Sequence, residues 1–393
     1  MALSYFEYFN PVKILSGKNA VDNIPYELEV LRAKRPLIIT DKGIVEAGLI
    51  DIVISCFKSS DVTIGAVYDS TPPDSSNLIV NEVAALYREN KCDSIIAVGG
   101  GSVLDTAKGV NMVITENTDD LMKYLGAERF KKPMQPFIAV PTTSGTGSEV
   151  TLVAVIANVE KKCKMAFTSY MLMPHVAVLD PRMTMTVPPK ITAATGMDAL
   201  THAVEAYSCL QKNPLSDAYA WSAISLIRDN LMKAVKNGKD EEARMAMANA
   251  SLMAGCAFSN SMVGIVHSIG HACGGVCHVP HGFAMAILLP HGMEYNLQAN
   301  AGLYGELLLP LGGPEEYART AADKRAVRTI AVIKELNNSL NKLAGLPVRL
   351  RDAGVNREQL PEIARTAQGD GSLIFNPVEA DYNDILEILK SAY

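Results

Sequence analysis

Two hydrophobic patterns divide the chain. Up to about residue 187, short runs of aliphatic and β-branched residues alternate with amphipathic segments. The runs at 36–40, 62–67, 93–98 and 176–179 predict buried strands, and segments 43–59 and 75–90 predict helices between them. Strands that alternate with helices build a parallel sheet with right-handed crossovers. The first part of the chain is therefore predicted to be an α/β domain.

The pattern changes at residues 187–189, where two prolines follow a valine. Beyond them Ala, Met and Leu recur at helical spacing through segments 215–235, 241–258, 319–343 and 384–391. Prolines in tandem are typical of a boundary between structural elements. The sequence thus predicts two domains, an α/β domain over residues 1–187 and an all-α helical domain over residues 188–393.

Composition narrows the class of protein. Apolar residues make up 48% and charged residues 20% of the 393 residues, as in ordinary globular proteins. The net charge of −6 and the lack of a Lys/Arg stripe argue against nucleic acid as a partner. There is no apolar run near twenty residues and no leader-like pattern, so no membrane partner is expected. Seven scattered cysteines indicate free thiols, so we expect a cytoplasmic protein.

The ends of the predicted strands carry residues that suit a bound nucleotide. Asp41 follows the first strand, where a carboxylate can accept a hydrogen bond from a ribose hydroxyl and repel a 2′-phosphate. The alternative is that Asp41 caps the next helix. After strand 93–98 a glycine-rich turn opens a helix whose first amides attract anions; a plain tight turn is the alternative. This second group consists of Gly99, Gly100, Gly101, Ser102, Asp105 and Lys108.

A third loop follows another apolar strand and is rich in hydroxyl groups. Segment 141–149 offers many hydrogen-bond donors with little steric bulk, which suits a pyrophosphate or ribose held close to backbone. A solvated loop is the alternative. Segments 151–159 and 163–168 then predict a strand pair around a charged turn at 160–162. The hydroxyl residues of the loop are Thr142, Thr143, Thr146 and Ser148.

Four of the seven histidines lie within fifteen residues, 267–281. His267 and His271 are one helical turn apart and so share a helix face; Gly274 and Gly275 are expected to end that helix. Upstream, Asp198 and His202 are again four residues apart. One carboxylate with three imidazoles suits Fe(II), Zn(II), Co(II) or Mn(II) rather than calcium or a soft copper site. The sequence therefore predicts a catalytic metal site.

Two alternatives stand beside this site. Single histidines often fill a core or cap a helix, although a cluster at regular spacing is harder to explain in that way. A structural zinc site could instead use Cys273, Cys277 and His278. We disfavour it, because a spacing of three residues between the cysteines, with a Gly-Gly pair in it, is not that of a zinc knuckle, and no second cysteine pair lies nearby.

These motifs together resemble the iron-containing (group III) alcohol dehydrogenases, from end to end of the chain. The resemblance rests on the glycine turn at 99–102, the hydroxyl loop at 141–149, the segment 195–205 and the histidine segment 267–281. It implies a Rossmann-like α/β domain followed by a helical domain, the architecture also found in dehydroquinate synthase. It further implies one divalent metal, Fe(II) with Zn(II) as the alternative, on Asp198, His202, His267 and His281.

The resemblance also assigns roles to other residues. His271 matches a position associated with proton relay, close to the metal without binding it. Family members often carry Pro-Asn-Pro where this chain has Pro72, Pro73 and Asp74, so one amide contact to the cofactor is expected to be missing. Val153 matches an apolar wall near the nicotinamide. The positions that match nucleotide contacts are Thr142, Thr143, Thr146, Ser148, Lys164 and Leu179.

The function implied is reversible hydride transfer between a small primary alcohol or diol, or its aldehyde, and NAD(H), with NADP less favoured. The enzyme is expected to be a homo-oligomer, a dimer or larger. A lyase of the dehydroquinate-synthase type is the first rival. It would need several basic residues near the metal for its polyanionic substrate, and the flanking segments contain almost none. A non-catalytic metal-binding protein is the second rival, but it would leave the nucleotide loops unexplained.

Overall fold

The computed structural model describes residues 5–161 and 163–393 and divides the chain into two compact units. We call Phe9–Val187 the α/β unit, and Pro188–Tyr393 together with residues 5–8 the helical unit. The change in hydrophobic pattern at residues 187–189 thus coincides with the division. The short segment 5–8 groups with the helical unit, whereas the sequence placed it in the first domain. Lys162, part of the predicted turn at 160–162, lies outside the described residues.

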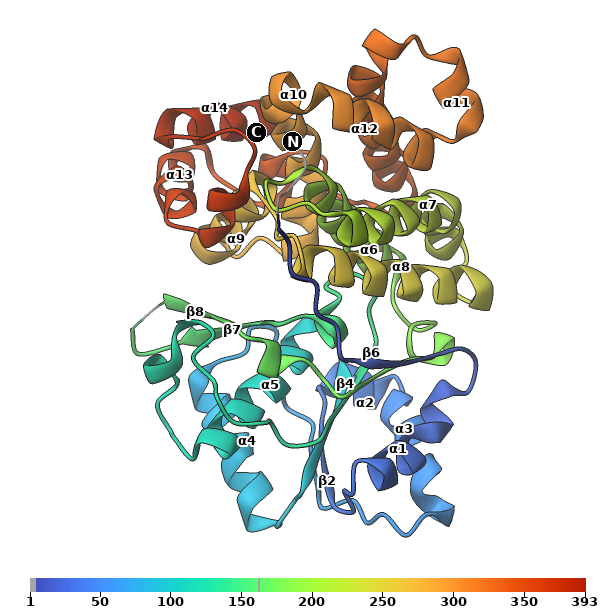
Figure 1. Cartoon of the computed structure of the whole chain (residues 1–393), viewed down its shortest axis with the longest axis vertical. Helices are drawn as coiled ribbons and strands as arrows, with labels where there is room; N and C mark the ends of the chain where they lie inside the picture. Colours follow the sequence, from blue (N-terminus) through green and yellow to red (C-terminus); the bar gives the residue numbers. More distant parts are fainter. Residues whose placement is uncertain (1–4, 162) are drawn as a thin grey trace. The chain divides into compact units, whose positions relative to one another are not determined.

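The α/β unit is built on a parallel sheet with the order β1-β9-β6-β4-β2-β3 (Figure 1). Strands β4 and β6 are buried along their whole length, which is expected for a parallel sheet covered by helices on both faces. The strands are β1 (Lys13–Ser16), β2 (Pro36–Ile39), β3 (Ala66–Tyr68), β4 (Ser94–Gly99), β6 (Phe137–Pro141) and β9 (Val176–Leu179).

Helices connect these strands, as the pattern predicts. One predicted helix and one predicted strand differ from the structure. The helix expected over 43–59 is broken at Gly48, which adopts a left-handed conformation (φ 71°) that glycine tolerates best. The strand expected at 62–67 is the shorter β3, shifted toward Tyr68. The helices are α1 (Ile24–Val30), α2 (Lys42–Glu46), α3 (Leu49–Ser55), α4 (Asn77–Glu89) and α5 (Gly101–Glu116). A second sheet holds β5 (Gly126–Ala127), β8 (Cys163–Thr168) and β7 (Val153–Asn158).

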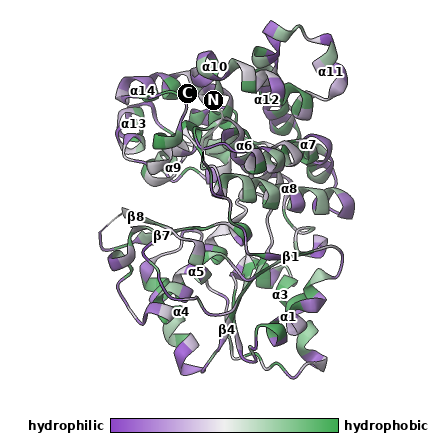
Figure 2. Cartoon of the chain, viewed as in Figure 1, coloured by the Kyte–Doolittle hydropathy of each residue, from purple (hydrophilic) through white to green (hydrophobic). Residues whose placement is uncertain are grey.

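The helical unit is organised around α6 (Pro189–Ser208), which is buried along most of its length from Thr192 onward. Neighbouring helices pack on it, among them α7 and α8 (Figure 1). In Figure 2, α13 and α14 show both hydrophobic and hydrophilic residues, as helices with one buried face do. The remaining helices are α7 (Pro214–Lys236), α8 (Glu241–Ser259), α9 (Ile265–Cys277), α10 (His281–Gly312), α11 (Pro314–Arg319), α12 (Arg325–Ala344), α13 (Leu360–Gln368) and α14 (Tyr382–Ala392).

Helix α9 runs through its glycine pair instead of ending there, so the break predicted at Gly274 and Gly275 is wrong. Each glycine costs a helix only about 1 kcal/mol, and the apolar face of α9 is buried in the core of the helical unit. The helix ends at His278, which takes the left-handed conformation (φ 56°), and the amide of Val279 returns to the carbonyl of Cys273.

The start of α10 touches the backbone of α6. A β-carbon added at Gly282 would lie 2.6 Å from the carbonyl oxygen of Ala194 and 2.8 Å from its carbonyl carbon. Backbone atoms cannot move aside as the tip of a side chain can. The two helices can therefore approach this closely only because residue 282 is glycine.

Replacing Gly282 by Ala should force α10 away from α6 and destabilise the helical unit by about 1–3 kcal/mol, the usual cost of overpacking. Gly302→Ala is the matched control, because Gly302 lies in the same helix and a β-carbon there would meet nothing within 4 Å. That substitution should leave stability unchanged or raise it slightly. Thermal unfolding of both variants provides the measurement, and equal midpoints for the two would contradict the packing argument.

Candidate functional site

Four potential metal ligands converge in the helical unit. Asp198 and His202 lie one turn apart on α6, His267 comes from the first turn of α9, and His281 is the first residue of α10. One ligand atom from each lies within 4.8 Å of the others. Oδ1 of Asp198 is 3.3 Å from Nε2 of His281 and 3.8 Å from Nδ1 of His202. The structure thus brings together the four residues that the family resemblance selects.

The protonation states of this group suit a cation. Burial raises the pKa of Asp198, but the surrounding imidazoles outweigh it and hold that pKa below its usual value. Burial lowers the pKa of His202 to about 3, and burial with the neighbouring His281 and His271 lowers that of His267 well below its usual value. At neutral pH the group therefore offers an ionised carboxylate on Asp198 and neutral imidazoles on His202 and His267, which is the form that binds a metal.

Three ligand atoms support the same conclusion. Oδ1 of Asp198, Nδ1 of His202 and Nε2 of His267 are buried, and none makes a hydrogen bond of good geometry within the described part of the chain. Buried polar atoms are almost always satisfied, because an unsatisfied one costs about 1–3 kcal/mol and a charged one more. Here three of them face one point. We conclude that the residues fit a divalent metal with nitrogen and oxygen ligands.

Two residues hold these imidazoles in place. The ring of Phe258 stacks on His202 with centroids 4.3 Å apart, and the carboxylate of Glu205 lies 2.5 Å from Nδ1 of His267. Burial raises the pKa of Glu205 to about 7, against the effect of hydrogen bonds from backbone amides. The sequence analysis assigned no role to Glu205. Its position three residues after His202, on the same face of α6, was the available signal.

His271 lies beside the group but outside it. Its ring stacks on that of His281 at 5.4 Å with an interplanar angle of 16°, and its Nδ1 lies 2.8 Å from Oδ2 of Asp370. Among the described residues, the set with mutually close ligand atoms does not include His271. Burial raises the pKa of Asp370, but its interactions with His271 and Ser372 together outweigh this effect and lower the pKa. Asp370, 99 residues away along the chain, gave no signal in the sequence.

The alternative zinc set receives no support from its surroundings. Cys273 is fully buried, and burial raises the pKa of its thiol to about 12, so it stays protonated rather than forming the thiolate that binds zinc. Cys277 shows a raised pKa for the same reason. Neither cysteine belongs to the group of converging ligands found within the described residues.

In the α/β unit, the predicted nucleotide loops lie at the point where the strand order reverses. The chain passes from β2 outward to β3 and then returns to β4 on the other side of β2. Ligands of parallel sheets bind at the carboxyl ends of the strands at such a point. Asp41 follows β2 there, and Gly99 ends β4. Gly99 pairs in register with Pro141 of β6. The amide of Thr142 donates a hydrogen bond to the carbonyl of Gly99 at 3.0 Å.

The glycine turn and the hydroxyl loop are therefore adjacent. Gly100 precedes α5, and Gly101 is its first residue, so the helix begins inside the glycine turn and not after it. Of the hydroxyl residues, Thr142 is buried at the end of β6, and Ser148 starts the 3-10 helix Ser148–Val150. Thr143 and Thr146 lie between them.

Several predicted nucleotide contacts are engaged with the protein itself. Asp105 accepts hydrogen bonds from the hydroxyl of Ser148 and the amide of Val155, both at 3.0 Å. The buried ammonium of Lys108 donates to the carbonyls of Thr151 and Val153. Burial lowers the pKa of Lys108 to about 8. Asp105 and Lys108 thus hold the loop after β6 against α5, and a direct role of Asp105 toward a cofactor stays a prediction.

The remaining predicted cofactor residues lie at the ends of elements. Asp41 caps α2 by accepting from the amide of Ile44 at 3.0 Å, the structural alternative that the sequence left open. Val153 begins β7 and Leu179 ends β9. Lys164 on β8 forms an exposed ion pair with Asp74 at 3.2 Å. The hydroxyl of Ser102 donates to the carbonyl of Pro73. These contacts leave their cofactor roles as predictions.

In the described part of the chain, none of the helices combines the length and the apolar character that crossing a membrane requires.

Comparison with known proteins agrees with these features. Residues 11–181 match the family model "Iron-containing alcohol dehydrogenase", and residues 192–393 match "Fe-containing alcohol dehydrogenase family, C-terminal". The chain is 38% identical to the 1,3-propanediol dehydrogenase of Klebsiella pneumoniae, over 100% of both proteins.

Solved structures are similar over nearly the whole chain. The crystal structure of a 1,3-propanediol oxidoreductase matches with a TM-score of 0.94 and 38% identity, covering 99% of this chain and 100% of that one. The sulfoacetaldehyde reductase of Bifidobacterium kashiwanohense, solved in complex with NAD+, matches with a TM-score of 0.86 and 30% identity, covering 99% of each chain. The expected fold class and the expected enzyme class are both confirmed. The chain belongs to the iron-containing alcohol dehydrogenase family.

Proposed function

We propose that this enzyme oxidises small primary alcohols or diols, and reduces the corresponding aldehydes, with NAD(H) and one divalent metal ion. The observation that carries the proposal is the convergence of Asp198, His202, His267 and His281, whose ligand atoms lie within 4.8 Å of one another, with the first three residues buried. Similarity to a 1,3-propanediol dehydrogenase supports a short substrate, and similarity to a reductase solved with NAD+ supports the cofactor.

The chemistry divides between the bound groups and the protein. A divalent metal supplies Lewis acidity toward the hydroxyl oxygen, and a nicotinamide supplies the hydride acceptor. The protein must orient the substrate and carry away the hydroxyl proton. His271 suits the second task, because Asp370 engages its Nδ1 and leaves Nε2 for the proton. In the aldehyde direction the same nitrogen returns the proton.

Further properties follow from the sequence and the family. Fe(II) is the favoured metal on the family's name, and Zn(II) is the alternative, because three imidazoles and a carboxylate bind Zn(II) more tightly. Apolar residues near the ligand segment, among them the partly exposed Phe258 and Val263, favour a short aliphatic substrate over a sugar. A homo-oligomeric state and a cytoplasmic location stay predictions.

The proposal is tested by stripping the protein of metal and restoring Fe(II) or Zn(II) separately, then assaying a panel of short alcohols, diols and aldehydes. Activity with NAD+ should require added metal. His281→Ala should lower kcat/KM by at least about a hundredfold, because it removes a ligand itself. His291→Ala is the matched control, since His291 pairs with Glu294 on α10, away from the ligand group. Full activity of metal-free protein would contradict the proposal.

Asp41 should make the enzyme prefer NAD over NADP by tenfold or more, because a carboxylate repels a 2′-phosphate. Asp41→Ser tests this without removing the helix cap, because serine is also a good N-cap residue. The ratio of kcat/KM for the two cofactors should fall toward one. Asp120→Ser, which changes another capping aspartate of the same unit, serves as control. If the ratio of kcat/KM for the two cofactors were unaltered in Asp41→Ser, Asp41 would act only as a helix cap.

His271→Ala should keep stoichiometric metal and near-normal NAD affinity while kcat falls by about ten- to ten-thousandfold, the range for a lost general acid–base group. Asp370→Asn should lower kcat less, because the imidazole remains. The control is His278→Asn at the end of the same helix, where asparagine tolerates the left-handed backbone. Loss of metal from His271→Ala would instead identify His271 as a ligand.

A further inference from the structure

Helix α9 lacks a capping side chain of its own. Its N-cap residue is Gly264, so the first amides of the helix must find acceptors elsewhere. They find them on distant segments. Oδ1 of Asn376 accepts from the amide of Ile265 at 3.2 Å, and Oε1 of Glu205 accepts from that of Val266 at 2.8 Å. The start of α9 is thus fixed by α6 and by the segment that follows residue 375.

Glu205 has a second task in the same contact. Its Oε2 accepts from the amide of His267 at 3.3 Å and lies 2.5 Å from Nδ1 of the same residue. A carboxylate that already faces two amide donors serves best as an acceptor for the ring as well. The proton of His267 then lies on Nδ1, and the lone pair lies on Nε2. Nε2 is the buried atom that makes no hydrogen bond within the described residues.

Only a carboxylate satisfies this arrangement. Each oxygen of Glu205 faces at least one N–H group, Oε1 that of Val266 and Oε2 those of His267. A glutamine would place its NH2 group against one of these donors in either orientation of the amide. If the NH2 group faced the ring, it would donate to Nδ1 and move the ring proton to Nε2, where a metal cannot bind.

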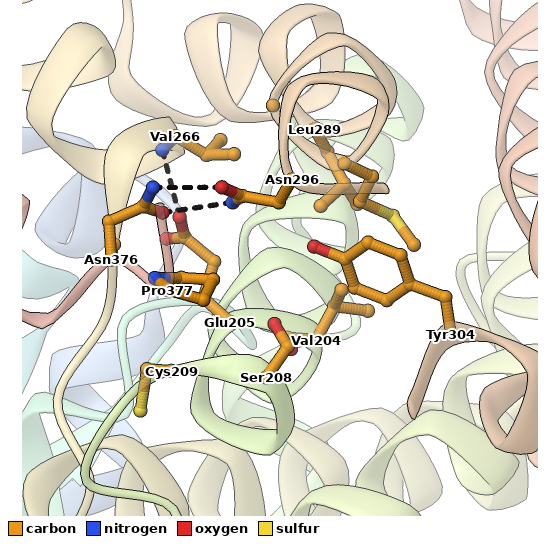
Figure 3. Close-up of a pocket in the computed structure, with 13 residues that line it drawn as sticks. Val204, Glu205, Ser208, Cys209, Val266, Leu289, Asn296, Tyr304, Asn376 and Pro377 are labelled. Carbon is orange, nitrogen blue, oxygen red and sulfur yellow. Dashed lines mark hydrogen bonds between the residues drawn. The ribbon is translucent and has the colours of Figure 1, made fainter. Parts of the chain in front are cut away.

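The surroundings keep Glu205 and Asn376 from moving. The amides of Asn376 and Asn296 bond to each other in both directions, at 2.9 and 2.8 Å. Figure 3 shows this pair beside the carboxylate of Glu205 and the amide of Val266. A β-carbon at Gly264 would lie 2.8 Å from Oδ1 of Asn376, so glycine is needed at that position.

The pocket enclosed here is not a substrate site. Its volume is about 10 Å³, the size of one water molecule. Its lining combines polar side chains, such as Ser208 and Asn296, with apolar ones, such as Leu289 (Figure 3). A cavity of this size leaves the residues around it tightly packed.

We propose that Glu205 is a positioning residue that fixes the Nδ1-protonated tautomer and the direction of His267, and so presents Nε2 to the metal. The inference rests on the proposed function only for the identity of the reaction. Its tests measure metal binding and the tautomer of His267 directly. Carboxylates behind metal-bound histidines orient the ring and raise its basicity, and their loss typically costs about 10- to 100-fold in metal affinity.

The tautomer can be read in unaltered, metal-free protein. Nitrogen NMR of protein labelled at histidine should show His267 protonated on Nδ1, with the signal assigned by its disappearance in His267→Gln. Protonation on Nε2 would overturn the proposal. This measurement needs no substitution at Glu205 and so stands even if variants at that position fold poorly.

Metal affinity gives the second test, by competition of Zn(II) or Co(II) with a chromophoric chelator. Glu205→Gln should bind about 10- to 100-fold more weakly, and Glu205→Asp, which keeps two acceptor oxygens, should lose less. The matched control is Glu27→Gln, another buried glutamate, paired with Lys13 in the α/β unit. Wild-type affinity in Glu205→Gln would overturn the proposal. Tight metal binding without alcohol oxidation by wild-type protein would overturn the proposed function alone.

Discussion

The charge of the buried carboxylate of Asp198 is the constraint on which the helical unit depends. An ionised group that is only 2% exposed costs several kcal/mol to bury unless charge and hydrogen bonds compensate it. The nearest polar groups are imidazoles, and burial keeps at least His202 and His267 neutral. They cannot supply the missing positive charge, but they can share a cation with the carboxylate. The same burial that makes Asp198 costly thus makes the group fit a metal ion.

The ligand residues and the buried residues that support them differ in whether their polar atoms are hydrogen-bonded. Glu205, Asn376 and Asn296 are also buried, yet their polar atoms bond to the protein around them. By contrast, Oδ1 of Asp198 and Nε2 of His267 make no hydrogen bond within the described residues, although Glu205 itself contacts His267. The groups that position His267 are therefore hydrogen-bonded to the protein, whereas these two ligand atoms are not, an arrangement that places the ligands in advance. Such preorganisation reduces the ordering cost when the metal binds.

Much of this arrangement could be predicted from the sequence. The change of pattern at Pro188 and the spacing of Asp198 and His202 depend on local periodicity, which a sequence displays directly. What could not be predicted depends on contacts between distant segments. Asp370 reaches His271 across 99 residues, and Asn376 completes a helix start 111 residues earlier. The helix end predicted at the glycine pair of α9 was wrong for a related reason. The weak local preference of glycine against helix was outweighed by burial of the helix face.

The α/β unit shows the converse case, in which charged residues near a predicted ligand are occupied by the protein. Lys108 donates to the carbonyl of Thr151 in the loop after β6. Asp105 accepts from the hydroxyl of Ser148 in that loop and from the amide of Val155 in β7, so both side chains are engaged in holding this segment. A residue so engaged acts on a cofactor mainly through the backbone it positions. For a nucleotide the unit still offers the hydroxyl loop after β6 and the glycine turn at the start of α5, where amide groups attract phosphate without any charged side chain. Recognition of the phosphates would then depend on backbone shape, and the choice between cofactors on the carboxylate of Asp41, whose second oxygen is not used by the helix cap.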